Sequence, residues 1–267
     1  MIFTAPVARA QDGAVDPGED VVVAGDWTFT LGAAYRNGDI DGYIQTAAGG
    51  EPGTTSLYRP TLSDVGIDDV ASPVITGDAR WRRERFTFEA RLVPLSGNST
   101  LDETLVSEGR TFPAGTAVDA DIELDWYRLM YGHTFPTWRG FTLTPSVGAA
   151  MLSVEYDLAG AGGVASRTYH KTGAIFGLEA TWPAAKPWWL ELELLAAPPF
   201  IDGAPRIAAE ALTVQYRLLD RSQLDVSISA GLAFEQLWYD DKYKQEVAND
   251  VHVDIGPAFI IGIDMRF

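Results

Sequence analysis

Apolar and polar residues alternate one by one along most of the chain after residue 25. In residues 27–36 the apolar positions are Trp27, Phe29, Leu31, Ala33 and Tyr35. A period of two is typical of a β-strand, whose successive side chains point to opposite faces. Ten residues is about the length that a tilted strand needs to cross a bilayer. The pattern therefore predicts a strand long enough to span a membrane.

Nine further segments repeat this alternation. They are residues 75–81, 86–92, 120–126, 141–147, 176–182, 188–194, 212–218, 224–235 and 259–267. We therefore expect an all-β fold, an antiparallel up-and-down transmembrane β-barrel that occupies residues 26–267. Ten is an even number of strands, as in single-chain bacterial barrels. Eight or twelve strands remain alternatives, because boundaries inferred from a pattern are uncertain by a few residues.

The connections between these segments alternate between short and long. The short ones are residues 82–85, 136–140, 183–187 and 219–223, and the long ones are residues 45–72, 97–115, 158–166 and 240–250, with 198–205 a shorter member. Transmembrane barrels have tight periplasmic turns and longer outer loops. In the first long loop, the apolar residues of 57–69 (Leu62, Val65 and Ile67) predict a short structured piece that folds over the barrel mouth.

Aromatic residues cluster near both kinds of connection. Beside the short turns and the chain ends lie Trp27, Trp81, Phe86, Phe135, Trp138, Phe141, Trp182, Trp188, Trp189 and Phe267. Towards the long loops lie Tyr35, Tyr43, Tyr156, Tyr169, Trp238 and Tyr239. We expect these two groups to form aromatic girdles at the two membrane interfaces.

Composition excludes several other classes of protein. The 267 residues carry a formal charge of −17, which argues against nucleic-acid binding because that needs a basic surface. The chain has no cysteine, so thiol chemistry and cysteine-ligated metals are excluded. No stretch approaches the roughly 18 apolar residues of a transmembrane helix. We expect no cofactor and no metal.

The N-terminus has the features of a processed segment. Residues 1–10 end in Ala8-Arg9-Ala10, which matches the small-residue pattern of a signal-peptide cleavage site. We interpret residues 1–10 as a signal-peptide remnant. Residues 11–25 are rich in Gly, Pro and Asp, so we expect them to form a flexible segment.

The last ten residues, Ala-Phe-Ile-Ile-Gly-Ile-Asp-Met-Arg-Phe, end in Phe267. This ending resembles the terminal strand of Gram-negative outer-membrane β-barrel proteins. The resemblance implies that Phe267 is part of the signal read by the barrel assembly machinery. It also implies a location in the bacterial outer membrane, with outer-membrane lipid and lipopolysaccharide as partners. The resemblance is architectural and identifies no subfamily.

If the apolar face of each strand meets lipid, the charged face lines the lumen. The charged residues expected there are Asp78, Arg80, Glu89, Arg91, Asp121, Glu123, Asp125, Glu179, Glu191, Glu193, Arg217, Asp225, Asp264 and Arg266. A barrel of about ten strands is narrow, so these side chains should largely fill it. The favoured function is therefore a structural protein or a narrow channel. If a path exists, the excess of acidic groups should favour cations.

Other functions remain alternatives. An outer-membrane hydrolase, either a lipid-modifying enzyme or a protease, could carry its site at the extracellular rim, with His170, His252 and Asp254 as weak catalytic candidates. A cation could bind the acidic row Asp119, Asp121, Glu123 and Asp125, although this spacing fits no EF-hand loop. A soluble lipocalin-like barrel would instead have polar residues outside and an apolar interior.

Overall fold

A computed structural model describes residues 27–45, 61–107, 110–201, 203–221, 224–240 and 249–267. The predictions for residues 1–10 and 11–25, and most of the first and last long loops, lie outside these ranges. No helix in the described part of the chain is long and apolar enough to cross a membrane.

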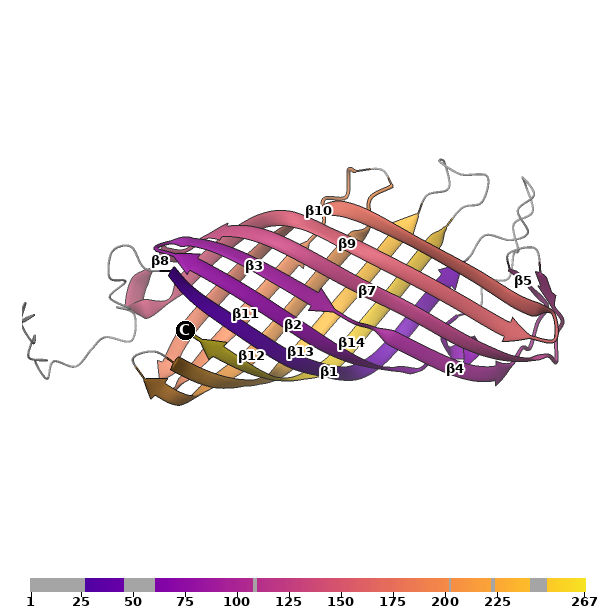
Figure 1. Cartoon of the computed structure of the whole chain (residues 1–267), viewed down its shortest axis with the longest axis horizontal. Coiled ribbons are helices and arrows are strands. Elements are labelled where there is room, and N and C mark those ends of the chain that lie inside the picture. Colours follow the sequence, from indigo (N-terminus) through magenta and orange to yellow (C-terminus); the bar gives the residue numbers. More distant parts are fainter. Residues whose placement is uncertain (1–26, 46–60, 108–109, 202, 222–223, 241–248) are drawn as a thin grey trace, which may run out of the picture.

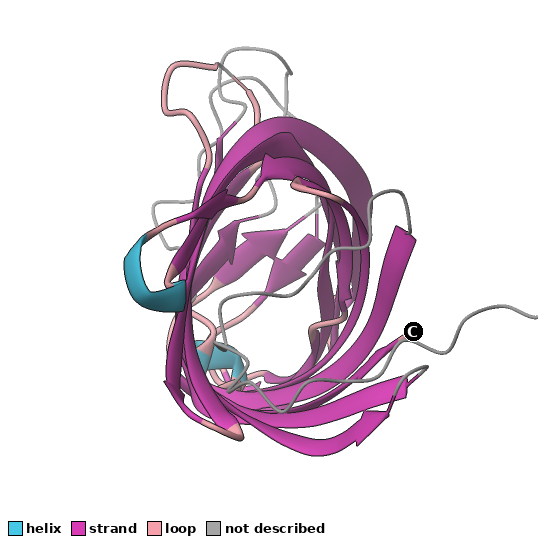
Figure 2. Ribbon diagram, turned by 90° about the vertical axis from the view of Figure 1, so that its left-hand side faces the viewer, coloured by secondary structure: helices cyan, strands magenta, loops and turns pink. Residues whose placement is uncertain are grey.

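Ten antiparallel strands close into a barrel, as the alternation predicts. They are β1 (Trp27–Gln45), β2 (Asp69–Trp81), β3 (Glu84–Arg91), β7 (Ala117–His133), β9 (Thr142–Gly160), β10 (Gly163–Ala185), β11 (Trp188–Ala196), β12 (Arg206–Arg221), β13 (Leu224–Asp240) and β14 (Asp250–Arg266). Each strand pairs with the next strand in this order, and β14 pairs back with β1. Seen along its length, the barrel is a ring of strands (Figure 2).

Shorter elements complete the sheet. β4 (Pro94–Thr100) follows β3 along the same partner, β7, after an interruption at residues 92–93. β5 (Leu105–Ser107) and β6 (Arg110–Phe112) form a separate hairpin. β8 (Phe135–Pro136) pairs with β9. Two 3-10 turns, η1 (Ser63–Val65) and η2 (Trp138–Gly140), lie in connections.

The two ends of the barrel differ, as the alternation of short and long connections predicts. One of the predicted long loops, however, is wrong. At the end that holds the C-terminus, only two residues separate β2 from β3 and β10 from β11 (Figure 1). We call this the turn end and the opposite end the loop end. The expected long loop at residues 158–166 does not exist, because β9 and β10 continue through it and are joined by residues 161–162. Its small and polar residues belong to strand surface outside the apolar belt.

An apolar belt surrounds the half of the barrel near the turn end. Its residues are exposed on the outer wall, with Leu129 62% and Ile261 71% accessible. Further members are Leu31, Ile75, Phe88, Val147, Phe176, Leu178, Leu212, Val214, Leu232 and Ile263. Water does not favour so large an apolar surface, whereas lipid does. A closed barrel with such a belt has the architecture of a transmembrane protein.

In the half near the loop end, the two faces of the wall exchange their polarity. Along β7, the inward positions Val118, Ala120, Ile122, Leu124 and Trp126 are buried and apolar, whereas the outward positions Asp119, Asp121 and Glu123 are exposed. Closer to the turn end the same strand points Arg128 inward and Leu129 outward. We call the part of the barrel between the level of Trp126 and the loop end the outer half.

Strand length explains this exchange. β7 has 17 residues, and at a rise of about 3.3 Å per residue it extends about 56 Å, or about 40 Å along the barrel axis at a tilt of about 45°. The apolar belt of such barrels is only about 25 Å tall. The outer half therefore extends beyond the lipid, where water requires polar groups outside and apolar groups inside.

The interior of the outer half is a packed apolar core. Wall residues such as Leu124, Leu152 and Leu158 are completely buried in it. The first loop contributes Leu62, Val65 and Ile67, and the β5–β6 hairpin contributes Leu105 and Phe112. The predicted structured piece within residues 57–69 is thus confirmed for its described part, and it packs into this core.

The aromatic residues follow the prediction mainly at the turn end, where Trp189 is an exception because it lies on the inward face of β11 beneath the Arg217 guanidinium. Near the turn end Trp27 stacks on Trp81, and Trp188 lies against Tyr216, with ring centroids 6.2 and 4.5 Å apart. At the loop end the predicted second girdle is wrong for three members. Tyr156 and Tyr239 are buried in the apolar core, and Tyr169 packs against it. These three tyrosines belong to the outer half and occupy inward positions, so they face the apolar core. The residues next to them in the sequence point outward and face water.

Candidate functional site: the charged lumen

A cluster of buried charges lies directly beneath the apolar core. Glu235 of β13 pairs with both Arg36 of β1 and Arg91 of β3, and all three side chains are almost completely buried. Arg91 also donates a hydrogen bond from Nε to Ser72 Oγ, at 2.9 Å. A buried charge must be paired and hydrogen-bonded to be tolerated. The cluster therefore ties β1, β2, β3 and β13 together across the lumen.

A third arginine, Arg128, lies at the same level on the opposite wall. Arg128 Nη2 lies 2.6 Å from Glu89 Oε2 and 2.6 Å from Glu193 Oε1. Glu89 and Arg128 face each other on neighbouring strands, whereas Glu193 reaches across from β11. Together with the Glu235 cluster, this level contains three arginines and three glutamates.

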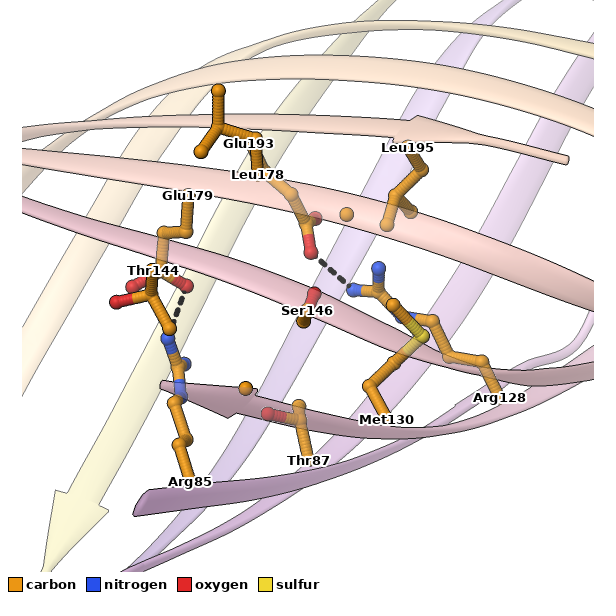
Figure 3. A pocket seen from close by; sticks show the side chains of 12 residues that line it. Arg85, Thr87, Arg128, Met130, Thr144, Ser146, Leu178, Glu179, Glu193 and Leu195 are labelled. Atoms are coloured by element: carbon orange, nitrogen blue, oxygen red, sulfur yellow. Dashed lines mark ion pairs between the residues drawn. The ribbon is translucent and has the colours of Figure 1, made fainter. Parts of the chain in front are cut away.

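Charges continue from there to the turn end. Arg85 pairs with Asp78 and with Glu179, and Arg80 Nε lies 2.7 Å from Asp78 Oδ1. Figure 3 shows Arg85 and Arg128 reaching towards Glu179 and Glu193 on the facing strands. At the mouth, Asp225 accepts contacts from Arg217 and Arg266, at 3.2 and 2.9 Å.

The space left between these side chains is small. A cavity between Arg85, Arg128, Glu179 and Glu193 holds about 30 Å³. This is the volume of about one water molecule. A hydrated ion or an organic substrate does not fit in it without movement of the side chains.

Eleven of the fourteen charged residues predicted from the sequence to line the lumen point inward. They are Asp78, Arg80, Glu89, Arg91, Glu179, Glu191, Glu193, Arg217, Asp225, Asp264 and Arg266. The prediction is wrong for Asp121, Glu123 and Asp125, which occupy the outward positions of β7. Their alternation is regular, but their segment belongs to the outer half, where the acidic face meets water.

Four charged residues of the network were not selected from the sequence: Arg36, Arg85, Arg128 and Glu235. Arg85 was assigned to a turn and Arg128 lies beyond the predicted end of its strand. Extending each alternating segment by one or two residue pairs would have included both. Arg36 and Glu235 are 199 residues apart in the chain, and only the closure of the barrel brings them together.

A bulge in β14 determines where His252 and Asp254 point. The register between β14 and both of its neighbours shifts at Gly256–Pro257, where β14 has one extra residue. Gly256 has φ +130°, a conformation that favours glycine. Inward positions are therefore odd-numbered before the bulge and even-numbered after it. His252 and Asp254 consequently lie on the outer wall.

The catalytic candidates thus lie on the outer surface, in two separate places. His252 Nε2 is 3.3 Å from Asp254 Oδ2, and its ring lies between Tyr43 and Trp238. His170 Nδ1 is 2.9 Å from Ser153 Oγ on the neighbouring strand. The remaining histidine, His133, contacts Glu84 at the turn end. Among the described residues no group of three or more His, Asp or Glu side chains could hold a metal ion.

Comparisons with known proteins identify no subfamily. No family model and no curated protein matches the chain. Among solved structures, Ail of Yersinia pestis is 12% identical, covering 90% of this chain and 98% of its own, with a TM-score of 0.34. OprG of Pseudomonas aeruginosa is 11% identical (91% and 96% covered, TM-score 0.37), and the outer-membrane protease OmpT of Escherichia coli is 9% identical (89% and 96%, TM-score 0.33).

Proposed function

We propose that this bacterial outer-membrane β-barrel is a closed, non-conducting protein that holds a rigid outer half above the lipid surface. The observation that carries the proposal is the apolar core of that half. Trp126, Leu124 and Leu152 are fully buried there, so the core occupies the path that an open channel would need.

Two barriers in series support this proposal. Ions that enter from the turn end first meet the paired charges of Arg85, Arg128 and Glu179, which leave room for about one water molecule. They then meet the apolar core, whose closely packed Leu, Val and Ile side chains cannot replace the hydration shell of an ion. Opening one barrier leaves the other in place.

Conductance in planar bilayers provides the direct test. We expect the purified, folded protein to give no discrete openings at neutral pH, because neither barrier opens without repacking. Heat-modifiable migration in a detergent gel verifies that the sample is a folded barrel, and a 16-stranded porin serves as the positive control for the bilayer. Stepwise single-channel currents from the folded protein would contradict the proposal.

A second candidate function, hydrolysis, rests on the contact between Ser153 and His170. Hydrogen-bonded Ser and His can form a nucleophile and its base. In such a reaction Ser153 would lose its proton to His170 and attack an ester carbonyl. The alcohol would leave with that proton, and water would then release the acid. This candidate is the weaker one, because among the described residues no carboxylate forms a hydrogen bond or an ion pair with the His170 ring.

The hydrolase candidate predicts an activity that needs both residues. The folded protein would hydrolyse p-nitrophenyl butyrate or vesicle phospholipid, and Ser153→Ala and His170→Ala would each lower the rate by about 100-fold or more, as for loss of a general base. His133→Ala is a matched control at the opposite end of the barrel. Equal rates for all three variants and the parent protein would exclude this site.

A further inference from the structure

In the described part of the chain, the outer half of β10 has a neighbouring strand on one side only. β10 pairs with β9 from Gly163 to Thr181, but it pairs with β11 only from Phe176 to Ala185. β11 ends at Ala196, so residues 163–175 of β10 extend past it. In Figure 1 this part of β10 lies along the upper side of the barrel.

The register shows which backbone groups face this open side. Ala197 donates a backbone hydrogen bond to Ile207 on the β12 side. Odd-numbered residues of β11 therefore face β12, and even-numbered ones, including Ala196, face β10. Ala196 is opposite Phe176, so even-numbered residues of β10 turn their N–H and C=O groups towards β11. Beyond the end of β11 these are Val164, Ser166, Thr168, His170, Thr172 and Ala174.

None of these six residues takes part in a backbone hydrogen bond to any described loop. The lower limit of the open edge is set by Gly173, where an added Cβ would lie 3.2 Å from the carbonyl oxygen of Pro205. The connection between β11 and β12 thus lies against β10 at that point. Residues 164–172 remain as the open edge.

This edge has few of the features that normally block pairing with another chain. Proteins protect exposed edges with proline, bulges, short strands or charges. Residues 164–172 contain no proline, and their register with β9 is unbroken. Val164, Thr168 and Thr172 are β-branched and favour an extended conformation. The charged residues here, Arg167 and Lys171, point inward.

The outer wall beside this edge is acidic. Glu155 and Asp157 of β9 lie opposite Thr168 and Ser166 of β10. On the other side of β9, Glu123 lies opposite Glu155, and Asp121 lies opposite Asp157. In the outer half, the outward positions of β4, β7, β9 and β10 contain no Lys or Arg. Basic side chains on an added strand would therefore find complementary charge.

The inward side of the edge has a different character. Tyr169 packs against Tyr239 of β13 with ring centroids 5.7 Å apart, and Lys171 Nζ lies 5.2 Å from the Tyr239 ring. Arg167 also points to this side. Aromatic rings favour apolar side chains, and the two cations disfavour basic ones. The two faces of the edge therefore select opposite kinds of side chain.

We propose that residues 164–172 of β10 bind an extended segment of another protein as an added strand, with Lys or Arg at its outward positions and apolar residues at its inward positions. Backbone hydrogen bonds would supply affinity, and the alternating side chains would supply selectivity. The inference concerns the outer surface, and it holds whether or not the barrel conducts.

The test is binding of a fluorescein-labelled peptide that alternates Lys and Val and matches residues 164–172 in length. It should bind the folded, detergent-solubilised barrel. The same peptide with alternate amides N-methylated keeps its charge but cannot pair with the edge, so it should bind about tenfold or more weakly, as for the loss of one or two hydrogen bonds. Equal binding of both peptides overturns the proposal and indicates charge attraction alone.

Variants of the barrel give an independent measurement. Thr168→Pro removes an edge N–H that has no strand partner among the described residues on that side, and proline is tolerated on edge strands. It should weaken binding by about tenfold, whereas Thr168→Ala, which keeps the N–H, should change it by less than about twofold. Unchanged binding to a folded Thr168→Pro barrel overturns the proposal. If that variant does not fold, the comparison of the two peptides still decides.

Discussion

Replacing Glu235 by glutamine is expected to lower the free energy of unfolding by about 3–5 kcal/mol, the cost of breaking a buried ion pair from one side. Glu235 pairs with both Arg36 and Arg91 in the lumen, so its single negative charge is shared by two guanidinium groups. Without its charge, two guanidinium groups remain in a region that water cannot reach freely. Arg91 is completely buried, and its remaining hydrogen bond is to the neutral hydroxyl of Ser72.

The measurement is urea-induced unfolding of the barrel in detergent micelles, followed by tryptophan fluorescence. Gln236→Ala is the matched control, because Gln236 follows Glu235 on β13 but is exposed on the outer wall. It should change stability by less than about 0.5 kcal/mol. If Glu235→Gln and Gln236→Ala were equally stable, the lumen would have to be hydrated enough to solvate free guanidinium groups.

Leu124→Ala should destabilise the protein by about 2–5 kcal/mol, as expected for a cavity in a packed core. Leu124 is completely buried in the apolar core of the outer half. Its neighbour Glu123 is exposed to water and faces Glu155 on the adjacent strand. Glu123→Ala therefore removes a repulsion between like charges and should have little effect or a slightly stabilising one.

The same unfolding experiment compares these two neighbours directly. If the wall kept one polarity along its whole length, Leu124 would face lipid and Glu123 would lie in the charged lumen. Glu123→Ala would then be the more damaging change, and Leu124→Ala would be mild. That order of stabilities would contradict the exchange of faces described for β7.

Much of the fold could be predicted because its signals are local. Each strand shows its period of two within a few residues, and each tight turn is marked by the break between two periods. Segments such as residues 27–36 and 259–267 were therefore found correctly, as was the number of strands. The apparent loop at residues 158–166 was the exception. Gly160, Gly162 and Gly163 are typical of turns, yet two of them belong to long strands.

The candidate site was harder to predict because alternation gives a period but no direction. In β7, Leu124 and Glu123 alternate in the same way whether lipid or water lies outside. Similarly, regular alternation counted back from the end of β14 would place His252 and Asp254 on the inward face. The one extra residue at Gly256–Pro257 places them on the outward face instead. Sequence spacing alone could not include that shift.

The sequence by itself determined an antiparallel barrel of about ten strands with unlike ends, because strand period and turn chemistry are local properties of the chain. Only the tertiary structure decided which face of each strand is the inside. That choice depends on the height of a residue along the barrel, since lipid surrounds one half and water the other. Closure also decided the partners of the lumen charges, because it brings Arg36 and Glu235 together from opposite ends of the chain.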